Sequence, residues 1–471
     1  MPIEAASRDY SLVGENAALA VQHGLAEATW YASPVPKDTM RDLLERRDGP
    51  ALRDTFLWFA LLVGSGVGAY GLWRVGSWWA AIPFMIYGVI YASTSDSRWH
   101  EAGHGTAFKT DWMNNALYEV ASFMVMRESV PWRWSHTRHH SDTIIIGRDP
   151  EIVAPRPPDI RGLVLGFFNI KTIPAYFRHL WLHAMGRMTP EERTYIPDSE
   201  FEKVFFRARI YLLIYSAVLG LAIYNRTMLP LMFVGLPALY GAWLMPIYGY
   251  TQHAGLAENV LDHRLNCRTV YMNRINRFLY WNMNYHVEHH MFPLVPYHNL
   301  PRLHEAVKAD MPRPYPSLFA AWRELVPAVL RQVKDPAYYV ERNLPARSPH
   351  AEASSGSRIF AGKAGTGDGW VEVCPSECLG NEGVIRLDYG QSTYAIYRGP
   401  EGRVYATDGF CTHGRAHLAE GFVKGNLIEC PKHNGRFDFT DGTARRKPAC
   451  VALRTFQTRE ENGKIFLRPA P

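Results

Sequence analysis

The stretch that decides the fold is "TFLWFALLVGSGVGAYGLW" at residues 55–73, which runs for 19 residues without a charged side chain. A second uncharged stretch of 21 residues, "VGSWWAAIPFMIYGVIYASTS" at 75–95, follows after a single arginine. The hydrocarbon core of a bilayer is about 30 Å thick, and an α-helix needs about 20 residues to cross it. Each stretch is therefore predicted to span a membrane, and the short connection between them predicts a tight helical hairpin.

A second pair of apolar stretches, 205–224 and 227–252, predicts a second hairpin. Arg207 and Arg209 lie in the first turn of 205–224, where long side chains can extend to the membrane interface. A buried core helix of a soluble protein is the alternative for any one stretch, but four stretches in two pairs favour a membrane domain. We expect an α-helical membrane domain with four transmembrane helices and a cytoplasmic helical cap.

The distribution of positive charge predicts the orientation of this domain. The short turns of the two hairpins hold only Arg74 and Arg226, whereas the segment 96–204 holds 13 Lys or Arg residues. Because positively charged loops stay in the cytoplasm, we expect a multi-pass protein of the cytoplasmic (inner) membrane with both termini inside. The net charge of +6 suits such flanks, and no nucleic-acid partner is expected. The N-terminus lacks the order of a cleaved signal, and six cysteines do not suggest a disulfide-stapled secreted fold.

Eight of the 19 histidines fall into three short clusters beside the apolar stretches. The clusters are His100 and His104 in "WHEAGH", His136, His139 and His140 in "HTRHH", and His286, His289 and His290 in "HVEHH". Spacings of three and four residues place side chains on one face of a helix, so we expect each cluster to point to one side. Eight candidate ligands exceed the need of one ion, and two metal ions are therefore predicted at the cytoplasmic surface.

The ligand type alone does not name the metal, because imidazole binds Zn, Cu, Fe and Ni. Zinc has no redox chemistry, so iron is favoured if the rest of the chain delivers electrons, which the cysteine and histidine pattern near the C-terminus indicates. Structural histidines and a bis-histidine haem are the alternatives, but paired haem ligands would not come as triplets.

The composition changes at residues 344–358, "LPARSPHAEASSGSR", which is typical of a linker between a first domain (1–343) and a second (359–471). Alternating stretches around Gly-Pro-Glu-Gly and Asp-Gly turns predict that the second domain is all-β. It contains "CTH" at 411–413 and "CPKH" at 430–433. This pattern predicts a Rieske [2Fe–2S] cluster, in which two thiolates hold one iron and two imidazoles hold the other. A structural Cys₂His₂ zinc site is the alternative for the same four residues. The candidate ligands are Cys411, His413, Cys430 and His433.

The three clusters, HxxxH, HxxHH and HxxHH in this order around two hairpins, resemble the integral-membrane fatty acid desaturase and hydroxylase superfamily over residues 25–315. The resemblance implies two non-haem Fe ions held by histidines, O₂ as co-substrate and two external electrons for attack on an unactivated C–H bond. It also implies one further histidine ligand upstream of the last cluster. His253 in "YTQHAGL" is the candidate, and His263 in "LDHRLNC" is its competitor.

The C-terminal domain resembles the soluble bacterial Rieske ferredoxins over residues 359–471. Respiratory Rieske proteins of high potential have an additional cysteine in each cluster loop, whereas Ala416 and Lys432 stand at the corresponding positions here. The resemblance implies a lower potential and a role as electron donor to the diiron centre. No Gly-x-Gly-x-x-Gly dinucleotide fingerprint follows a predicted strand, so a separate NAD(P)H-dependent ferredoxin reductase is the expected partner.

Acidic residues within or beside the clusters are candidates to hold the second ring nitrogen of the ligating imidazoles. Carboxylates often fix the tautomer of a metal ligand in this way, and Glu101, Asp142 and Glu288 are in position by sequence. Solvated charge on a helix face is the alternative. The polar turn "TIIIGRDPEI" at 143–152 is a candidate lining of a substrate entrance.

The leading hypothesis is a membrane-bound oxygenase that hydroxylates or desaturates a lipid or a small organic substrate. Stretches such as "HHSDTIIIGRDPEI" at 139–152 look most like the bacterial rhizopine-oxygenase-like subgroup, which implies O-demethylation of a methylated small molecule as an alternative. A membrane electron-transfer protein is a further alternative, although electron transfer alone would not need nine ligands. A soluble Rieske ring-hydroxylating oxygenase fits least, because that class resembles a Rieske domain placed before a site of two His and one carboxylate.

Overall fold

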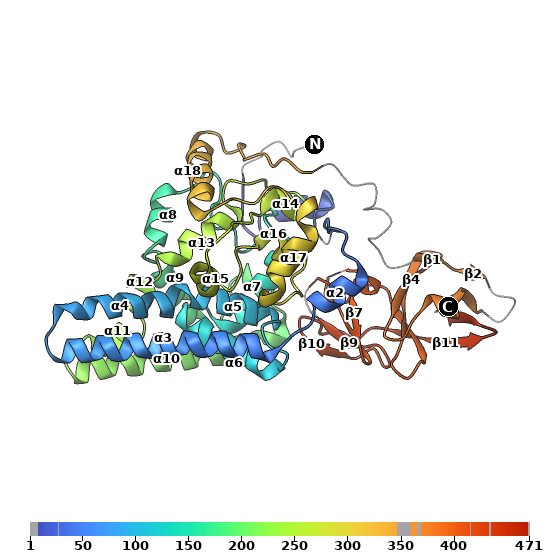
Figure 1. Ribbon diagram of the computed structural model, residues 1–471, viewed down its shortest axis with the longest axis horizontal. Helices are drawn as coiled ribbons and strands as arrows, with labels where there is room; N and C mark the ends of the chain where they lie inside the picture. The colour runs from blue at the N-terminus through green and yellow to red at the C-terminus, as the bar shows by residue number, and fades with distance from the viewer. Residues whose placement is uncertain are drawn as a thin grey trace. The chain divides into compact units, whose positions relative to one another are not determined.

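The structure is a computed structural model, and it describes residues 8–26, 28–345, 359–364, 369–414, 416–432 and 435–469. The chain divides into two compact units (Figure 1). The larger unit holds residues 1–26, 43–291 and 295–346, and the smaller holds 27–42, 292–294 and 347–471. Of the predicted linker, residues 346–358 lie outside the described residues.

The larger unit is helical. Its α-helices are α1 (Glu15–Gln22), α3 (Asp48–Arg74), α4 (Ala81–Gly88), α5 (Ser95–His104), α6 (Asp111–Met124), α7 (Ser129–Ser141), α8 (Ile160–Gly166), α9 (Thr172–Ala184), α10 (Phe201–Tyr224), α11 (Leu229–Phe233), α12 (Pro237–Tyr240), α13 (Leu244–His253), α14 (His263–Asn266), α15 (Arg274–Leu279), α16 (His286–Met291), α17 (Leu300–Val307) and α18 (Leu318–Lys334), and α2 (Lys37–Leu43) precedes α3.

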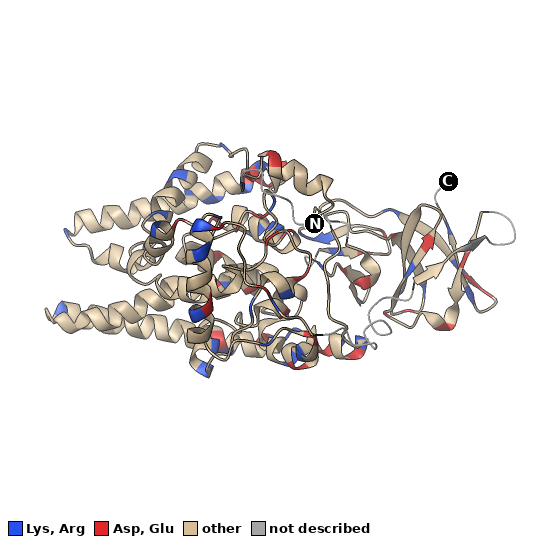
Figure 2. Ribbon diagram, turned by 90° about the horizontal axis from the view of Figure 1, so that it is seen from above, with Lys and Arg blue, Asp and Glu red and all other residues tan. Residues whose placement is uncertain are grey.

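Two segments, Lys37–Arg74 and Asp198–Tyr224, are long and apolar enough to cross a membrane by length and composition. They contain the first and third predicted spans. Large apolar side chains point outward from both, such as Phe56 on α3 and Leu213 on α10, which are 72% and 70% exposed. Figure 2 shows the long helices of this unit tan over most of their length, with blue at their far tips and most of the charged residues towards the opposite end. Apolar helix faces of this kind suit a lipid or protein surround rather than water.

The second predicted span, 75–95, runs beside α3 as the other arm of a hairpin (Figure 1), but it is not one regular α-helix. It begins with a 3₁₀ turn (Trp78–Ala80), continues as α4 and enters a π-helical turn (Val89–Ser93) before α5. Single π turns shift the helical register by one residue and are frequent at functional sites. Here the shift comes immediately before the helix that bears the first histidine cluster.

The fourth predicted span, 227–252, is divided into α11, α12 and α13. Gly235 takes a φ of +100°, and Pro237 has no N–H to continue a helix from the preceding turn. Gly241 approaches the backbone of α4 so closely that a Cβ there would lie 2.0 Å from the carbonyl carbon of Gly88. The prediction of four single transmembrane helices is therefore not confirmed, because two of the four stretches are interrupted.

The smaller unit contains an all-β fold, as predicted. Its strands are β1 (Ile359–Ala361), β2 (Lys363–Ala364), β3 (Val371–Pro375), β4 (Val384–Tyr389), β5 (Ser392–Arg398), β6 (Val404–Asp408), β7 (Phe422–Lys424), β8 (Leu427–Glu429), β9 (Arg436–Asp438), β10 (Ala444–Arg446), β11 (Thr455–Glu461) and β12 (Lys464–Arg468). One sheet has the order β1-β4-β5-β6-β11-β12-β3-β2, and the other has the order β10-β9-β8-β7. All pairs are antiparallel except β1 with β4.

Strand β5 separates two apolar cores because successive side chains of a strand point to opposite faces. Tyr394 and Ile396 belong to one core, and Ala395 and Tyr397 belong to the other. The ring of Tyr397 stacks on Phe439 with centroids 4.6 Å apart. The second core also contains both cysteines of the predicted cluster site, so the fold places these thiols in an apolar, water-poor environment.

Candidate metal centres

Five imidazoles from three helices converge on one point. They are His100 and His104 of α5, His136 and His140 of α7, and His289 of α16, and their ligand atoms all lie within 4.8 Å of one another. The Nε2 atom of His136 lies 3.2 Å from Nε2 of His104 and 3.2 Å from Nε2 of His140. Nε2 of His100 lies 2.6 Å from Nε2 of His289. The rings therefore present the same nitrogen to a shared centre.

Four further imidazoles form a second group beside the first: His139 of α7, His253 at the end of α13, and His286 and His290 of α16. The Nε2 atom of His286 lies 3.0 Å from Nε2 of His253 and 3.0 Å from Nε2 of His290. His139, His253 and His290 offer ligand atoms within 4.8 Å of one another. All nine predicted histidines are thus brought together, in groups of five and four.

The spacing of the two HxxHH clusters predicted that each would point to one side. The structure shows instead that each cluster divides between the two groups. In α7, His136 and His140 enter the first group, whereas His139 enters the second. In α16, His289 enters the first group, whereas His286 and His290 enter the second. Residues i and i+4 lie 40° apart on a helix and i+3 lies 60° to the other side, so each triplet reaches two neighbouring centres.

The arrangement of hydrogens in the second group fits a cation at its centre. His253 Nδ1 lies 2.9 Å from the carbonyl oxygen of Asn266, which can only accept, so this nitrogen donates. Burial lowers the pKa of His253 and of His286 well below the ordinary value, so both rings are neutral, and Nε2 of His253 bears a lone pair. Nitrogens about 2.1 Å from one metal ion lie about 3.0–3.4 Å apart, which matches the spacing between these rings.

The second ring nitrogens of α7 are held by carboxylates from the turn that follows this helix. Nδ1 of His139 donates to Oδ2 of Asp149 at 2.8 Å, and Nδ1 of His136 donates to Oε2 of Glu151 at 3.0 Å. Burial alone would raise the pKa of Glu151, but the charge and hydrogen bond of His136 lower it to about 2. The turn 143–152, predicted as a substrate entrance, therefore supports the histidines in the structure.

The three acidic residues predicted for this role have other partners in the described part of the chain. Glu101 accepts from Thr106 Oγ1 and from the backbone N–H of Tyr297, and burial raises its pKa to about 7. Asp142, just beyond the end of α7, pairs with Arg138 of that helix and with Arg148 of the following turn. Glu288 accepts from Thr269 Oγ1 at 2.5 Å and from His304 Nδ1 at 2.5 Å. For Glu101 and Glu288 helix geometry explains the correction, because a residue adjacent to a ligand points roughly 100° away from it, whereas Asp142 lies just beyond the end of α7.

The structure separates the two candidates for the ninth histidine. Nε2 of His253 lies 3.0 Å from Nε2 of His286 in the second group, whereas His263 contacts this group through His290, with ring centroids 5.1 Å apart. His263 shares a third arrangement of potential ligand atoms with Cys267 and His290. The contact of His253 with His286 favours His253 for the role that the sequence left open between the two.

In the smaller unit, Cys411 and Cys430 are both buried in one core. A hydrogen bond with the thiol of Cys430 lowers the pKa of the Cys411 thiol to about 7 against the effect of burial, so the two side chains are neighbours in this core. The N–H of Cys411 donates to Ala416 O at 2.9 Å and the N–H of Cys430 donates to Gly435 O at 2.8 Å, which closes a loop after each cysteine. His413 lies in the first loop, and His433 lies outside the described residues.

Comparison with known proteins identifies both parts of the chain. The family profile described as "Fatty acid desaturase" matches residues 76–322, and the profile described as "Rieske [2Fe-2S] domain" matches residues 369–457. The ferredoxin component of the naphthalene 1,2-dioxygenase/salicylate 5-hydroxylase systems of Ralstonia sp is 34% identical over 99 residues, which cover 21% of this chain and 94% of that protein.

Two further comparisons match the same C-terminal part. The ferredoxin component of the 2,4-dinitrotoluene dioxygenase system of Burkholderia sp. (strain RASC) is 43% identical over 101 residues, which cover 21% of this chain and 96% of that protein. A chain in the solved complex of reduced oxygenase and oxidized ferredoxin in carbazole 1,9a-dioxygenase is 32% identical, with a TM-score of 0.21, and the match covers 22% of this chain and 94% of that chain.

The desaturase match covers more than half of the chain, and the Rieske match includes both predicted cluster loops. These findings confirm the sequence-based recognition of an O₂-dependent oxidoreductase whose cofactors are a diiron centre and a [2Fe–2S] cluster. The chain belongs to the fatty acid desaturase family and carries a C-terminal Rieske [2Fe–2S] domain.

Proposed function

We propose that this protein is a membrane-bound non-haem diiron oxygenase. It uses O₂ and electrons relayed by its own Rieske domain to hydroxylate or desaturate an unactivated C–H bond of a lipid or a small organic substrate. The observation that supports this most directly is the convergence of nine imidazoles into two adjacent groups within a desaturase-family domain.

The proposal assigns one iron ion to each imidazole group. The iron ligands are His100, His104, His136, His139, His140, His253, His286, His289 and His290, and the cluster ligands are Cys411, His413, Cys430 and His433. A diiron pair held there supplies the activation of O₂ and the oxidising power for attack on a C–H bond.

The protein's own groups fix the direction of the imidazoles. Asp149 and Glu151 accept from Nδ1 of two rings of α7, which leaves the Nε2 lone pair of each ring directed at its centre. Thr143 acts on α16 in the same way. Its hydroxyl donates to His139 O at 2.7 Å, so its oxygen lone pair accepts from Nδ1 of His290 at 3.2 Å. Imidazole rings that are fixed by these hydrogen bonds need little reorganisation when the iron ions change oxidation state.

Burial keeps water away from both groups. His286 and His289 are at most 1% exposed, and the ring of Trp99 lies 5.1 Å from that of His136. Exclusion of water strengthens electrostatic interactions within a site and prevents the loss of reactive oxygen to side reactions. Seven of the nine histidines are buried, and such a water-poor site suits O₂ chemistry on an unactivated C–H bond.

The Rieske domain is proposed as the electron donor. A [2Fe–2S] cluster transfers one electron at a time, so two deliveries are needed for each O₂. Tethering donor and acceptor in one chain raises their effective concentration to the millimolar range for a short flexible connection. A separate NAD(P)H-dependent ferredoxin reductase is proposed to reduce the Rieske cluster after each transfer, as the likeness of the domain to ferredoxin components of dioxygenase systems suggests.

Membrane attachment is proposed through α3 and α10, whose apolar lengths support it. The arginines and lysines of 96–204 favour the cytoplasmic side of the inner membrane for the histidine groups, where a soluble reductase would have access. Membrane lipids are then neighbours of the helices and candidate substrates.

Whole-cell feeding under ¹⁸O₂ tests the proposal. Cells that make the protein with a compatible reductase receive a panel of fatty acids, alkanes, methyl ethers and methylated inositols, and products are analysed by mass spectrometry. A labelled alcohol shows hydroxylation, released formaldehyde shows O-demethylation, and an unlabelled alkene formed only with O₂ shows desaturation. His140→Gln should abolish product formation, whereas His23→Gln, at an exposed position on the N-terminal arm, should not.

The iron content separates the proposal from its rivals. The purified chain should contain about four iron atoms and two acid-labile sulfides. Zinc in the imidazole groups would overturn the oxygenase assignment. The same conclusion would follow if fully iron-loaded protein gave no O₂-dependent product from any substrate, and electron transfer without substrate oxidation would then be the better account.

A further inference from the structure

A second cluster of histidines and carboxylates lies outside the two imidazole groups. Helix α9 presents His179 and His183 one turn apart, and Glu192 begins the 3₁₀ turn Glu192–Thr194. One ligand atom from each of these three residues lies within 4.8 Å of the other two. His183 and Glu192 are buried, whereas His179 is half-buried. The proposed oxygenase chemistry makes no use of this cluster.

The distances within the cluster suit ligands of one ion. Nε2 of His183 lies 3.1 Å from Oε2 of Glu192, and Nδ1 of His179 lies 3.4 Å from Oε1 of the same carboxylate. Ligand atoms about 2.1 Å from a shared ion are separated by about 3.0–3.4 Å. The rings of the two histidines stand at 87° to each other with centroids 6.1 Å apart, so both can direct a nitrogen into the space between them.

A carboxylate behind the buried imidazole completes the pattern. Nδ1 of His183 lies 2.9 Å from both oxygens of Glu128, the residue before α7. Metal-ligating histidines commonly donate their other N–H to a carboxylate in this way. Glu192 is itself fixed, because its Oε2 accepts from the N–H of Thr189 at 2.9 Å and from its hydroxyl at 2.8 Å.

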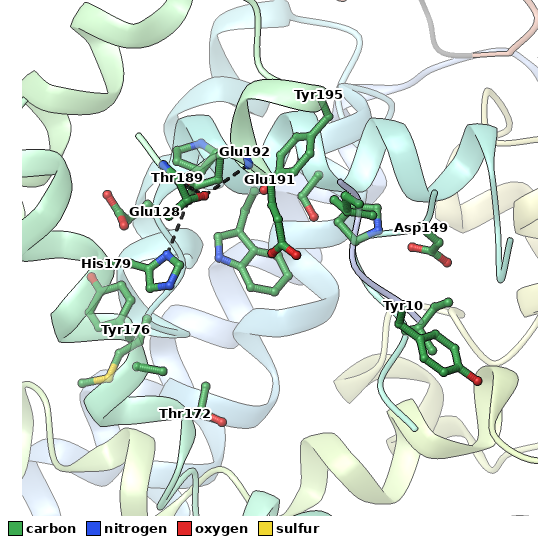
Figure 3. A pocket seen from close by; sticks show the side chains of 18 residues that line it. Tyr10, Glu128, Asp149, Thr172, Tyr176, His179, Thr189, Glu191, Glu192 and Tyr195 are labelled. Atoms are coloured by element: carbon green, nitrogen blue, oxygen red, sulfur yellow. Dashed lines mark hydrogen bonds and ion pairs between the residues drawn. The ribbon is translucent and has the colours of Figure 1, made fainter. Parts of the chain in front are cut away.

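The cluster opens onto a cavity of about 350 Å³. Figure 3 shows His179, Glu192 and Glu191 together on one wall, with Thr189 beside them and Tyr195 above. The lining contains Glu128, Glu191 and Glu192 but no Lys or Arg among the described residues. The cavity therefore has the negative potential that attracts a cation.

We propose that His179, His183 and Glu192 bind one divalent metal ion of the zinc class, at a site separate from the iron centres. Two imidazoles and one carboxylate leave a tetrahedral ion one open position, which here faces the cavity and accepts water or a small oxygen or nitrogen ligand. With both imidazoles neutral, the two charges of the ion balance the charges of Glu192 and Glu128.

Without an ion, a proton takes over part of this balance. Burial alone would lower the pKa of His183, but its hydrogen bonds to Glu128 and Glu192 raise it to about 9. Arg178 lies 3.3 Å from the outer nitrogen of His179, and because its side chain is exposed it can move into solvent when the ion binds.

Zinc titration of the iron-loaded full chain tests the proposal, with zinc and iron counted together by mass spectrometry. The wild type should bind one Zn²⁺ per chain with its iron content unchanged. His179→Gln removes a half-buried ligand and should lower the affinity at least tenfold, again with full iron. Glu191→Gln changes a carboxylate on the same wall that is not a ligand, and it should bind zinc as the wild type does.

Zinc-edge X-ray absorption supplies the second readout, with two imidazoles and one carboxylate expected around the ion. A wild type that binds no zinc while its iron remains bound would overturn the proposal and identify the cluster as an ion triad of Glu128, protonated His183 and Glu192. Equal zinc binding by wild type and His179→Gln would also overturn it. Neither result concerns the iron centres, so the zinc proposal and the proposed oxygenase function are tested independently.

Discussion

Asp149→Asn is the sharpest perturbation of the iron centres, because it removes one charge and changes no volume. Asp149 is buried and touches no metal position itself. Its Oδ2 accepts from Nδ1 of His139 at 2.8 Å and from the N–H of Ile144 at 2.7 Å, and its Oδ1 accepts from the N–H of Glu151 at 2.7 Å. The carboxylate thus fixes an imidazole and the turn that follows α7 at the same time.

The magnitude follows from these three hydrogen bonds. An asparagine retains one acceptor oxygen, so its amide NH₂ must face an N–H donor on one side or the other. A buried donor left without an acceptor costs about 1–3 kcal/mol, and loss of a carboxylate partner typically lowers metal affinity 10–100-fold. We expect Asp149→Asn to lose about 2 kcal/mol of stability and to release iron from the second group 10–100-fold more readily.

Iron release to a chromophoric ferrous chelator measures this effect, and chemical denaturation measures the stability. Asp142→Asn is the matched control, because Asp142 is equally buried but pairs with Arg138 at 2.7 Å and Arg148 at 3.1 Å. Both variants should lose stability, but only Asp149→Asn should lose iron affinity. Equal retention of iron by the two variants would refute the argument that the Asp149–His139 hydrogen bond supports a ligand.

Three further changes test other parts of the structure. Gly241→Ala should destabilise the helical unit by about 1–3 kcal/mol in a detergent melt because its Cβ clashes with Gly88, whereas Gly220→Ala, with open space around it, should not. Cys411→Ser should remove the labile sulfide and about two irons per chain while the other iron stays, and loss of all iron would contradict separate centres. Burial lowers the pKa of His417 to about 4, so protonation opposes folding. Wild-type stability should therefore fall by up to about 1.4 kcal/mol per unit from pH 6.5 towards 4, and His417→Gln should show a shallower slope.

The sequence was sufficient to name the histidines that converge, because each cluster lies within one helix and helix geometry is local. His253 required a resemblance, since one isolated histidine has no spacing to mark it. The division of each triplet between two groups could not be predicted from α7 or α16 alone. It depends on where α5 and α13 meet them, which is set by tertiary packing.

The supporting carboxylates were wrongly predicted for a related reason. Glu101 and Glu288 are each adjacent to a ligand on one helix, and adjacent residues on a helix point away from each other, whereas Asp142 lies just beyond the end of α7. Asp149 and Glu151 return to α7 through a turn in which Gly147 takes a φ of +75°, a conformation that favours glycine. A Cβ on Gly147 would lie 2.5 Å from the backbone nitrogen of Ala17, so the N-terminal arm packs against this turn.

The interrupted spans show where composition misleads. An apolar run predicts burial in lipid or protein but says nothing about continuity, and 227–252 contains the glycines and prolines that break it. The interruptions of the two apolar stretches help to position the histidine site. Ser93 in the π turn donates to the carbonyl oxygen of Gly241 at 2.7 Å, and its oxygen accepts from the N–H of Leu244 at 3.1 Å, which starts α13. That helix ends at His253, so the interruption places the ninth histidine.

The shared helices also bear on how the two iron positions act together. Helices α7 and α16 each supply both imidazole groups, and the ring of His140 in the first group stacks on that of His290 in the second, with centroids 4.2 Å apart and planes at 13°. An ion bound in one group fixes α7 and α16, which also supply ligands to the other group. Binding of the first ion therefore meets much of the entropy cost of ordering the ligands for the second ion. Two sites joined in this way favour paired loading over single occupancy. Paired loading suits chemistry that draws two electrons for each O₂, because a lone iron in this chamber would bind ligands without completing the reaction.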